Sequence, residues 1–229
     1  MTERWQHKER VQIAQAFDAD IRALTKRNTP NVRAVRKRFS KALAEAPPAF
    51  MQELAMALVH EYGYRGEAYE LLLNHKAAFE SLTESRIEAL GEGIDSWHAV
   101  DGFARLISGP AWLAGLIEDT KIHRWARSED LWWRRAALVS TVALNMRSHG
   151  GYGDVDRTLA VCTMLADDHE DMVIKALSWA LRALVVHDPD AVQRFLTTHD
   201  EVLAARVKRE VNNKLETGLK NPGKARDAG

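Results

Sequence analysis

The sequence predicts an all-α protein. Apolar residues recur at spacings of three and four along most of the chain, and no stretch alternates as a half-buried strand does. Proline, glycine and capping residues divide the chain into short periodic segments. With 229 residues the chain can bury a substantial core without disulfides, and its single cysteine, Cys162, lies in an apolar run where we expect it to be buried and inert. We predict one domain over residues 1–220, followed by a disordered tail, 221–229.

The start signals place each helix in turn. Thr29-Pro30 supplies a capping hydroxyl and a proline at the first helical position. Ser81 and Glu84 have capping-box spacing, and Ser128 is placed to cap the segment that follows it. Pairs such as Asp188-Pro189 give the same signal later in the chain. The expected helices begin near Thr29, Pro48, Ala68, Glu84, Ser96, Gly109, Glu129, Asp154, Glu170, Pro189 and Ala204.

One internal repeat bears on how these helices are arranged. The hexapeptide Glu129 to Arg134 aligns with Glu170 to Lys175 at an offset of 41 residues, acidic first, then apolar, then basic. This period is typical of helix-pair repeats of the HEAT type. Stacked pairs curve into a solenoid with a concave face that suits an extended ligand. The sequence favours such an array, with a closed helical bundle as the alternative.

The zero net charge conceals an uneven distribution. Residues 1–41 carry 11 basic and 4 acidic side chains, residues 42–205 carry 14 and 25, and residues 206–229 carry 7 and 3. Two basic ends are consistent with a polyanionic partner, although they are also consistent with ordinary solvated helix faces. The opening residues do not resemble a signal peptide and no apolar run is long enough to span a membrane, so we expect a cytoplasmic protein.

The motifs argue against metal or nucleotide chemistry. The nine histidines show no zinc-ligand spacing, and one cysteine cannot make a cysteine-rich site, so we expect no metal and no other cofactor. The glycine cluster Gly150 to Gly153 lacks the lysine and the preceding strand of a phosphate-binding loop.

The stretch Ile94 to Asp101 holds the most suggestive pair. A helix starting at Asp95 or Ser96 places Trp97 and Asp101 on one face. An indole and a carboxylate side by side can stabilise a developing cation and orient a water molecule. The alternative is a Trp that packs in the core beside a solvated Asp.

Several blocks, taken together and in order, resemble the AlkD family of DNA alkylation repair glycosylases. They are Thr29-Pro30 before a basic helix, Asp95-Ser96-Trp97 with Asp101, Trp132 to Leu138, Ile174 to Arg182, and Val207 to Glu210. The resemblance covers about residues 28–215. It implies a right-handed solenoid of HEAT-like antiparallel helix pairs whose concave face binds duplex DNA. It also implies removal of cationic N3- and N7-alkylated purines in base excision repair, without a metal and without base flipping.

The resemblance also assigns residues. The family's catalytic aspartate corresponds to Asp101, its two active-site tryptophans to Trp97 and Trp179, and its active-site arginine to Arg135, with Arg134 as the alternative. An arginine there would grip a phosphate beside the lesion, unless it pairs with an acidic neighbour such as Asp101. Two departures stand out: the family often has two tryptophans where this chain has Ser96-Trp97-His98, and an N-terminal aromatic has only Phe17 as a candidate.

Affinity for duplex DNA is expected to come from phosphate contacts rather than from base-specific ones. The expected donors are Arg33, Arg36, Lys37, Arg134, Lys175, Arg182, Lys208 and Arg209. We expect a monomer. Two other functions stay open: a DNA-binding relative that has lost catalysis, and a protein-interaction scaffold, which the acidic middle segment favours. The adduct, simple methyl or bulky, is also open.

Overall fold

A computed structural model describes residues 7–222 and confirms the all-α prediction, since these residues contain no strand. The helices are α1 (His7–Arg22), α2 (Thr29–Ala42), α3 (Pro48–His60), α4 (Arg65–Leu73), α5 (Lys76–Glu80), α6 (Glu84–Gly91), α7 (Trp97–Phe103), α8 (Gly109–Leu113), α9 (Asp119–Ala126), α10 (Leu131–Asn145), α11 (Val155–Met164), α12 (Asp171–Leu184), α13 (Pro189–Thr198) and α14 (Ala205–Thr217). A π-helical turn, η2 (Ala104–Ser108), joins α7 to α8, and a 3₁₀ turn, η3 (Arg147–His149), follows α10. Most of the predicted tail, residues 223–229, lies outside the described residues.

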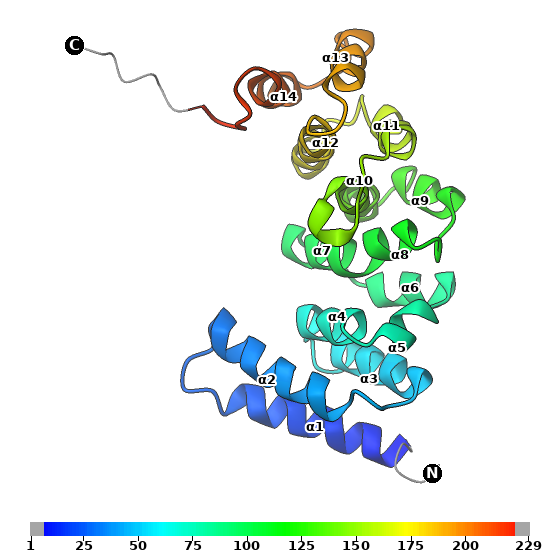
Figure 1. Cartoon of the computed structure of the whole chain (residues 1–229), viewed down its shortest axis with the longest axis vertical. Coiled ribbons are helices and arrows are strands. Elements are labelled where there is room, and N and C mark those ends of the chain that lie inside the picture. The colour runs from blue at the N-terminus through cyan, green and yellow to red at the C-terminus, as the bar shows by residue number, and fades with distance from the viewer. Residues whose placement is uncertain (1–6, 223–229) are drawn as a thin grey trace, which may run out of the picture.

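The helices are stacked along the long axis of the molecule in chain order (Figure 1). One column is continuous through direct contacts of α2 with α4, α4 with α7, α7 with α10, α10 with α12 and α12 with α14. We call these six helices the first column. In Figure 1, α5, α6, α9, α11 and α13 lie on the opposite side of the stack. The solenoid of HEAT-like repeats stays a prediction.

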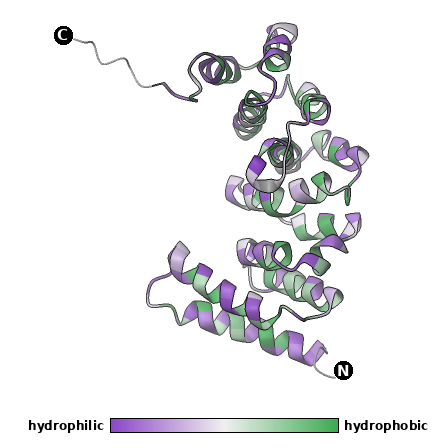
Figure 2. Cartoon of the chain, viewed as in Figure 1, coloured by the Kyte–Doolittle hydropathy of each residue, from purple (hydrophilic) through white to green (hydrophobic). Residues whose placement is uncertain are grey.

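Helix α10 lies at the centre of the stack. Every residue of α10 from Arg135 to Asn145 is buried, and the helix packs against α7, α8, α9, α11 and α12. Its neighbour α12 is the helix that aligned with it in the sequence repeat. Figure 2 shows hydrophobic residues on the sides of the helices that face one another and hydrophilic residues on the outer sides. Cys162 is fully buried, as expected, and burial raises the pKa of its thiol.

Residues 97–113 form one continuous helical run, where the sequence suggested separate helices starting at Ser96 and Gly109. The N–H of Gly109 donates to the carbonyl of Ala104 across the wider π turn. Pro110 explains this widening, because a proline inside an α-helix has no N–H to donate and its ring clashes with the carbonyl four residues earlier. Gly109 and Pro110 therefore mark a change of helical geometry rather than a helix start.

Three predicted caps are wrong by one or two residues. Asn28, not Thr29, caps α2 through its side chain, which accepts a hydrogen bond from the N–H of Asn31. Thr83 caps α6, and Asp130 caps α10. In each case the residue in extended conformation next to the first helical turn is the one that can reach the free N–H groups.

Three helices were not predicted: α1, α5 and α9. Helix α5 has five residues, too few to show a period. Helix α9 does carry a signal: Asp119 lies in its first turn, and Ile122, Trp125 and Ala126 are buried at helical spacing. None of the described helices combines the length and apolarity needed to cross a membrane.

The close approach at Gly109 makes a stability prediction. A Cβ at this position would lie 2.6 Å from Cβ of Ala143 and 2.7 Å from the carbonyl oxygen of Ala104. We expect Gly109→Ala to lower the free energy of unfolding by about 1–3 kcal/mol through overpacking. Gly102 in the same helical run is the matched control, since its Cβ would meet nothing within 4 Å. In urea denaturation, Gly102→Ala should raise the free energy of unfolding by about 0.5–1 kcal/mol. If the two substitutions change the free energy of unfolding equally, the tight contact at Gly109 is contradicted.

A second prediction concerns Glu88 on α6. Its carboxylate accepts hydrogen bonds from Lys121 Nζ at 2.9 Å, from Trp125 Nε1 at 3.0 Å and from Arg124. Burial opposes ionisation, but these donors outweigh it and lower the pKa of Glu88 to about 2 from an ordinary value of 4.5. The stabilisation by Glu88 is therefore present above pH 4.5 and is lost as the pH falls from 4.5 towards 2. Glu88→Gln should make unfolding less pH-dependent in that window, as measured by urea titrations at several pH values.

Candidate functional site

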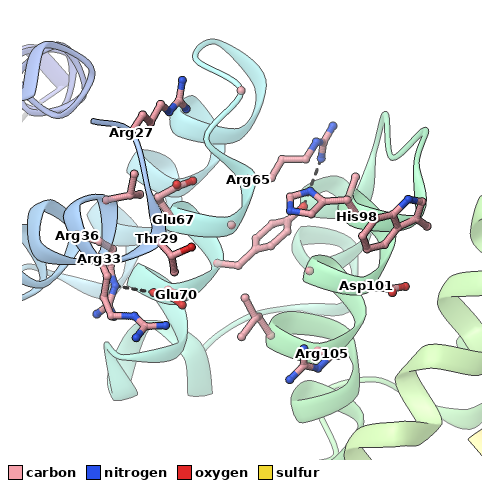
Figure 3. A pocket seen from close by; sticks show the side chains of 18 of the residues that line it. Arg27, Thr29, Arg33, Arg36, Arg65, Glu67, Glu70, His98, Asp101 and Arg105 are labelled. Carbon is pink, nitrogen blue, oxygen red and sulfur yellow. Dashed lines mark hydrogen bonds and ion pairs between the residues drawn. The ribbon is translucent and has the colours of Figure 1, made fainter. Parts of the chain in front are cut away.

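A groove with a volume of about 810 Å³ lies along the first column (Figure 3). Its walls come from the segment before α2 and from α2, α4, α7 and η2, and Trp179 of α12 also lines it. Five arginines line it, against three carboxylates, Glu67, Glu70 and Asp101. The groove thus brings together residues from the first half of the chain with one from α12.

Asp101 is held in place by a bidentate contact with Arg135. Its Oδ1 and Oδ2 accept hydrogen bonds from Nε and Nη2 of Arg135, each at 3.0 Å. Arg135 is only 5% exposed, and its Nη1 also donates to the carbonyl of Met172 at 2.6 Å. Arg135 is not among the residues that line the groove, whereas Asp101 is. The arginine therefore fixes the carboxylate of a residue that lines the groove, and each carboxylate oxygen keeps a further lone pair.

The sequence assigned Arg135 to a phosphate and named the ion pair with Asp101 as the alternative. The observed contacts are those of the alternative. A phosphate contact by this buried guanidinium stays a prediction without support from the geometry, and holding Asp101 is the role that its contacts describe.

Trp97 and Trp179 both line the groove with Asp101. Ser96 caps α7, so Trp97 is its first residue and Asp101 follows one turn later on the same face. Trp97 is 55% exposed. The other tryptophans of the described chain are partly or fully buried: Trp112, Trp125, Trp132, Trp133 and Trp179. An indole this exposed is not explained by core packing, which was the alternative for Trp97.

The groove arginines differ in how they are bound. Arg36 pairs with Glu70 at 2.7 Å, and Arg65 donates to the hydroxyl of Tyr69 and to two carbonyls. Arg27 lies over the ring of Tyr64, and Arg33 is exposed. Arg105 belongs to η2. Of these five, the sequence predicted only Arg33 and Arg36 as contacts.

A second pocket, of about 380 Å³, shares Trp179 with the groove. Its basic lining residues are Arg147, Arg182, Lys214 and Lys220, and no carboxylate lines it. Arg182 was predicted as a contact; its Nε donates to Ser178 Oγ at 3.1 Å, and burial lowers the pKa of its guanidinium. Positive side chains thus continue past Trp179 towards the C-terminal end of the stack.

The other predicted contacts lie outside both cavities. Arg134 pairs with Asp168 at 2.7 Å, Lys175 with Asp171 at 2.6 Å and Lys208 with Asp200 at 3.1 Å. Lys37 and Arg209 are exposed on their helices. Contact of these five residues with DNA stays a prediction.

Sequence reasoning missed Arg27, Arg65, Arg105, Arg147, Lys214 and Lys220. A count of charge by segment does not single out individual residues. Three of the six lie in the two basic end segments, and the other three lie in the acidic middle segment. Phe17 is 1% exposed and packs against Phe39 and Tyr64 in the core, so it supplies no aromatic wall to the groove. His98 is exposed and lines the groove beside Trp97.

Comparison with known proteins places the chain in a family. The family model described as DNA alkylation repair enzyme matches residues 4–215, nearly the whole chain. The protein therefore belongs to the family of DNA alkylation repair enzymes. No curated protein and no solved structure matched the chain. Within residues 7–222, no group of three or more His, Cys, Asp or Glu side chains is arranged to hold a metal ion.

The Asp101–Arg135 pair yields a third prediction. Asp101→Ala leaves two N–H groups of a buried guanidinium without acceptors, which should lower the free energy of unfolding by about 1–3 kcal/mol. Asp101→Asn keeps one acceptor oxygen in the same place and should lower the free energy of unfolding by less than Asp101→Ala does. Chemical denaturation of the two variants beside the wild type measures the difference. If both variants unfold at the same denaturant concentration as the wild type, the ion pair does not contribute to stability.

Proposed function

We propose that this protein is a DNA glycosylase that hydrolyses the N-glycosidic bond of cationic N3- or N7-alkylated purines in duplex DNA, and so starts base excision repair. One observation carries the proposal: Asp101, Trp97 and Trp179 together line a groove that five arginines also line, while Arg135 holds the carboxylate of Asp101 in place. Membership of the DNA alkylation repair enzyme family supplies the class of substrate.

The proposed reaction needs few catalytic groups from the protein. An alkylated purine is already positively charged, so when the bond from C1′ to the base nitrogen breaks, its electron pair neutralises the departing base and no general acid is required. The sugar left behind resembles an oxocarbenium ion. The carboxylate of Asp101 would stabilise this cation, and the indoles of Trp97 and Trp179 would present their negative faces to it. Water then attacks C1′, and its proton passes to Asp101 or to solvent.

The geometry also supports a path for the duplex. The groove and the second pocket share Trp179, and together their lining has nine Lys or Arg side chains against three carboxylates. Contacts of this kind bind phosphates and carry no base sequence, which suits an enzyme that must act in any sequence. We further propose that the stack is a right-handed solenoid of HEAT-like helix pairs whose concave side follows the duplex.

Further features of the proposal follow from the same site. Trp97 stands 55% exposed in an open groove and not in an enclosed base pocket, which supports attack on the sugar without base flipping. We propose a monomeric, cytoplasmic enzyme that needs no metal. The adduct is either a simple methyl group or a bulkier alkyl group.

The test is base release from duplex DNA that contains N7-methylguanine. Wild-type protein should produce abasic sites, and Asp101→Asn should slow release at least about 100-fold, because a charge that stabilises the transition state is lost. Asp168→Asn is the matched control: Asp168 also forms a half-buried ion pair with an arginine of α10, Arg134, but does not line the groove. The control should stay within a few-fold of the wild type.

Other outcomes point to other functions. Salt-sensitive duplex binding with no release of methylated or bulkier adducts would indicate a relative without catalysis. A protein that neither binds duplex DNA nor releases a base would be a scaffold, although the basic lining of both cavities argues against one.

A further inference from the structure

Arg105 is the half-buried groove arginine for which the described residues supply no acceptor. Its Nε is buried and has no hydrogen-bond partner among the described residues. None of the ion pairs found within residues 7–222 includes Arg105, and the residue is only half-buried. Figure 3 shows its side chain at the edge of the groove, on the same helical run as Asp101.

This situation is unfavourable for the free protein. A guanidinium that is partly removed from water without a compensating acceptor loses hydration and gains nothing in return. The other inward arginines avoid this: Arg36 pairs with Glu70, and Arg135 with Asp101. Asp101 is four residues before Arg105, the spacing of a helical ion pair, but its two oxygens already accept from Arg135.

Arg105 is part of the π turn. It lies in η2, between the buried Ala104 and the half-buried Leu106, and both Arg105 and Leu106 line the groove. A widened turn of this kind often occurs at functional sites, where it redirects a side chain. Here the turn directly follows the helix that carries Asp101, and it presents a planar set of N–H donors to the groove.

We infer that Arg105 binds a backbone phosphate of the strand that carries the reacting nucleotide, and so positions that nucleotide over Asp101. This inference rests on the proposed function. One helical turn separates the two residues, about 6 Å along the axis, while successive nucleotides of one strand rise by about 3.4 Å. The phosphate therefore lies within one or two nucleotides of the reacting sugar. A phosphate supplies the anionic, bidentate acceptor that the guanidinium lacks in the protein.

The first experiment measures affinity for an undamaged duplex over a range of salt concentrations. Arg105→Met keeps the apolar stem and removes the charge. We expect it to weaken binding about tenfold, the equivalent of one charged hydrogen bond, and to reduce the slope of log K against log[salt] by about one. Arg194→Met is the matched control, because Arg194 is exposed on α13 and lines neither cavity. It should leave the slope unchanged.

The second experiment locates the phosphate. Single phosphates on each side of an N7-methylguanine are replaced, one at a time, by neutral methylphosphonates, and the rate of base release is measured. Wild-type protein should lose activity at one linkage within two nucleotides of the lesion, and Arg105→Met should be insensitive at that same linkage. Such non-additivity is the mark of a direct contact. Arg105→Lys keeps the charge without the fork and should retain the salt slope but bind more weakly than the wild type.

The unfolding temperature distinguishes phosphate binding by Arg105 from a purely structural role. Arg105→Met should unfold at the same temperature as the wild type or higher, since an unpaired charge is removed. A lower unfolding temperature with an unchanged salt slope would overturn the inference, as would an unchanged slope in a stable variant. If wild-type protein binds the duplex but releases no base, the proposed catalysis fails while the binding experiment still decides the role of Arg105. If it binds no duplex, both fail.

Discussion

The contact between Asp101 and Arg135 is the constraint on which the arrangement of the site depends. It joins α7 to α10, and the third donor of the same guanidinium reaches the carbonyl of Met172 at the start of α12. Three consecutive members of the first column are thereby tied at one point. Because the donor lies on α10, where every residue from Arg135 to Asn145 is buried, the carboxylate is fixed by the core and not by an exposed side chain. Any reaction in the groove would then begin from a preorganised charge.

The fold class and much of the site could be predicted from the sequence because they depend on local patterns. Asp154 and Asp188 were correctly predicted as the residues after which α11 and α13 begin. The four-residue spacing of Trp97 and Asp101 correctly predicted that both lie on one face, and both line the groove. The junction of α7 with α8 could not be predicted this way. Gly109-Pro110 has the same local pattern as a helix start, and only the packing of Gly109 against α10 distinguishes the two cases.

The partners of the charged residues were the hardest feature to predict. Arg134, Lys175 and Lys208 are basic residues in plausible places, yet each is paired with an aspartate. Conversely, Arg65 and Arg105 lie in the acidic middle segment and reach the groove from separate turns. Net charge over a segment sums groups that face opposite sides of the stack, so it cannot reveal the sign of one face. That sign emerges only when the helices are placed beside one another.

The π turn after α7 also has a consequence for how the protein can vary. An extra residue in a turn rotates everything that follows it by roughly 100° relative to an uninterrupted α-helix. Upstream of η2 the run presents Trp97 and Asp101 to the groove, while downstream it buries Trp112 in the core. Because of this extra residue, the part of the run before η2 and the part after it can face different directions. Substitutions on the groove half can change what the surface recognises without demanding new packing from the half that holds the stack together.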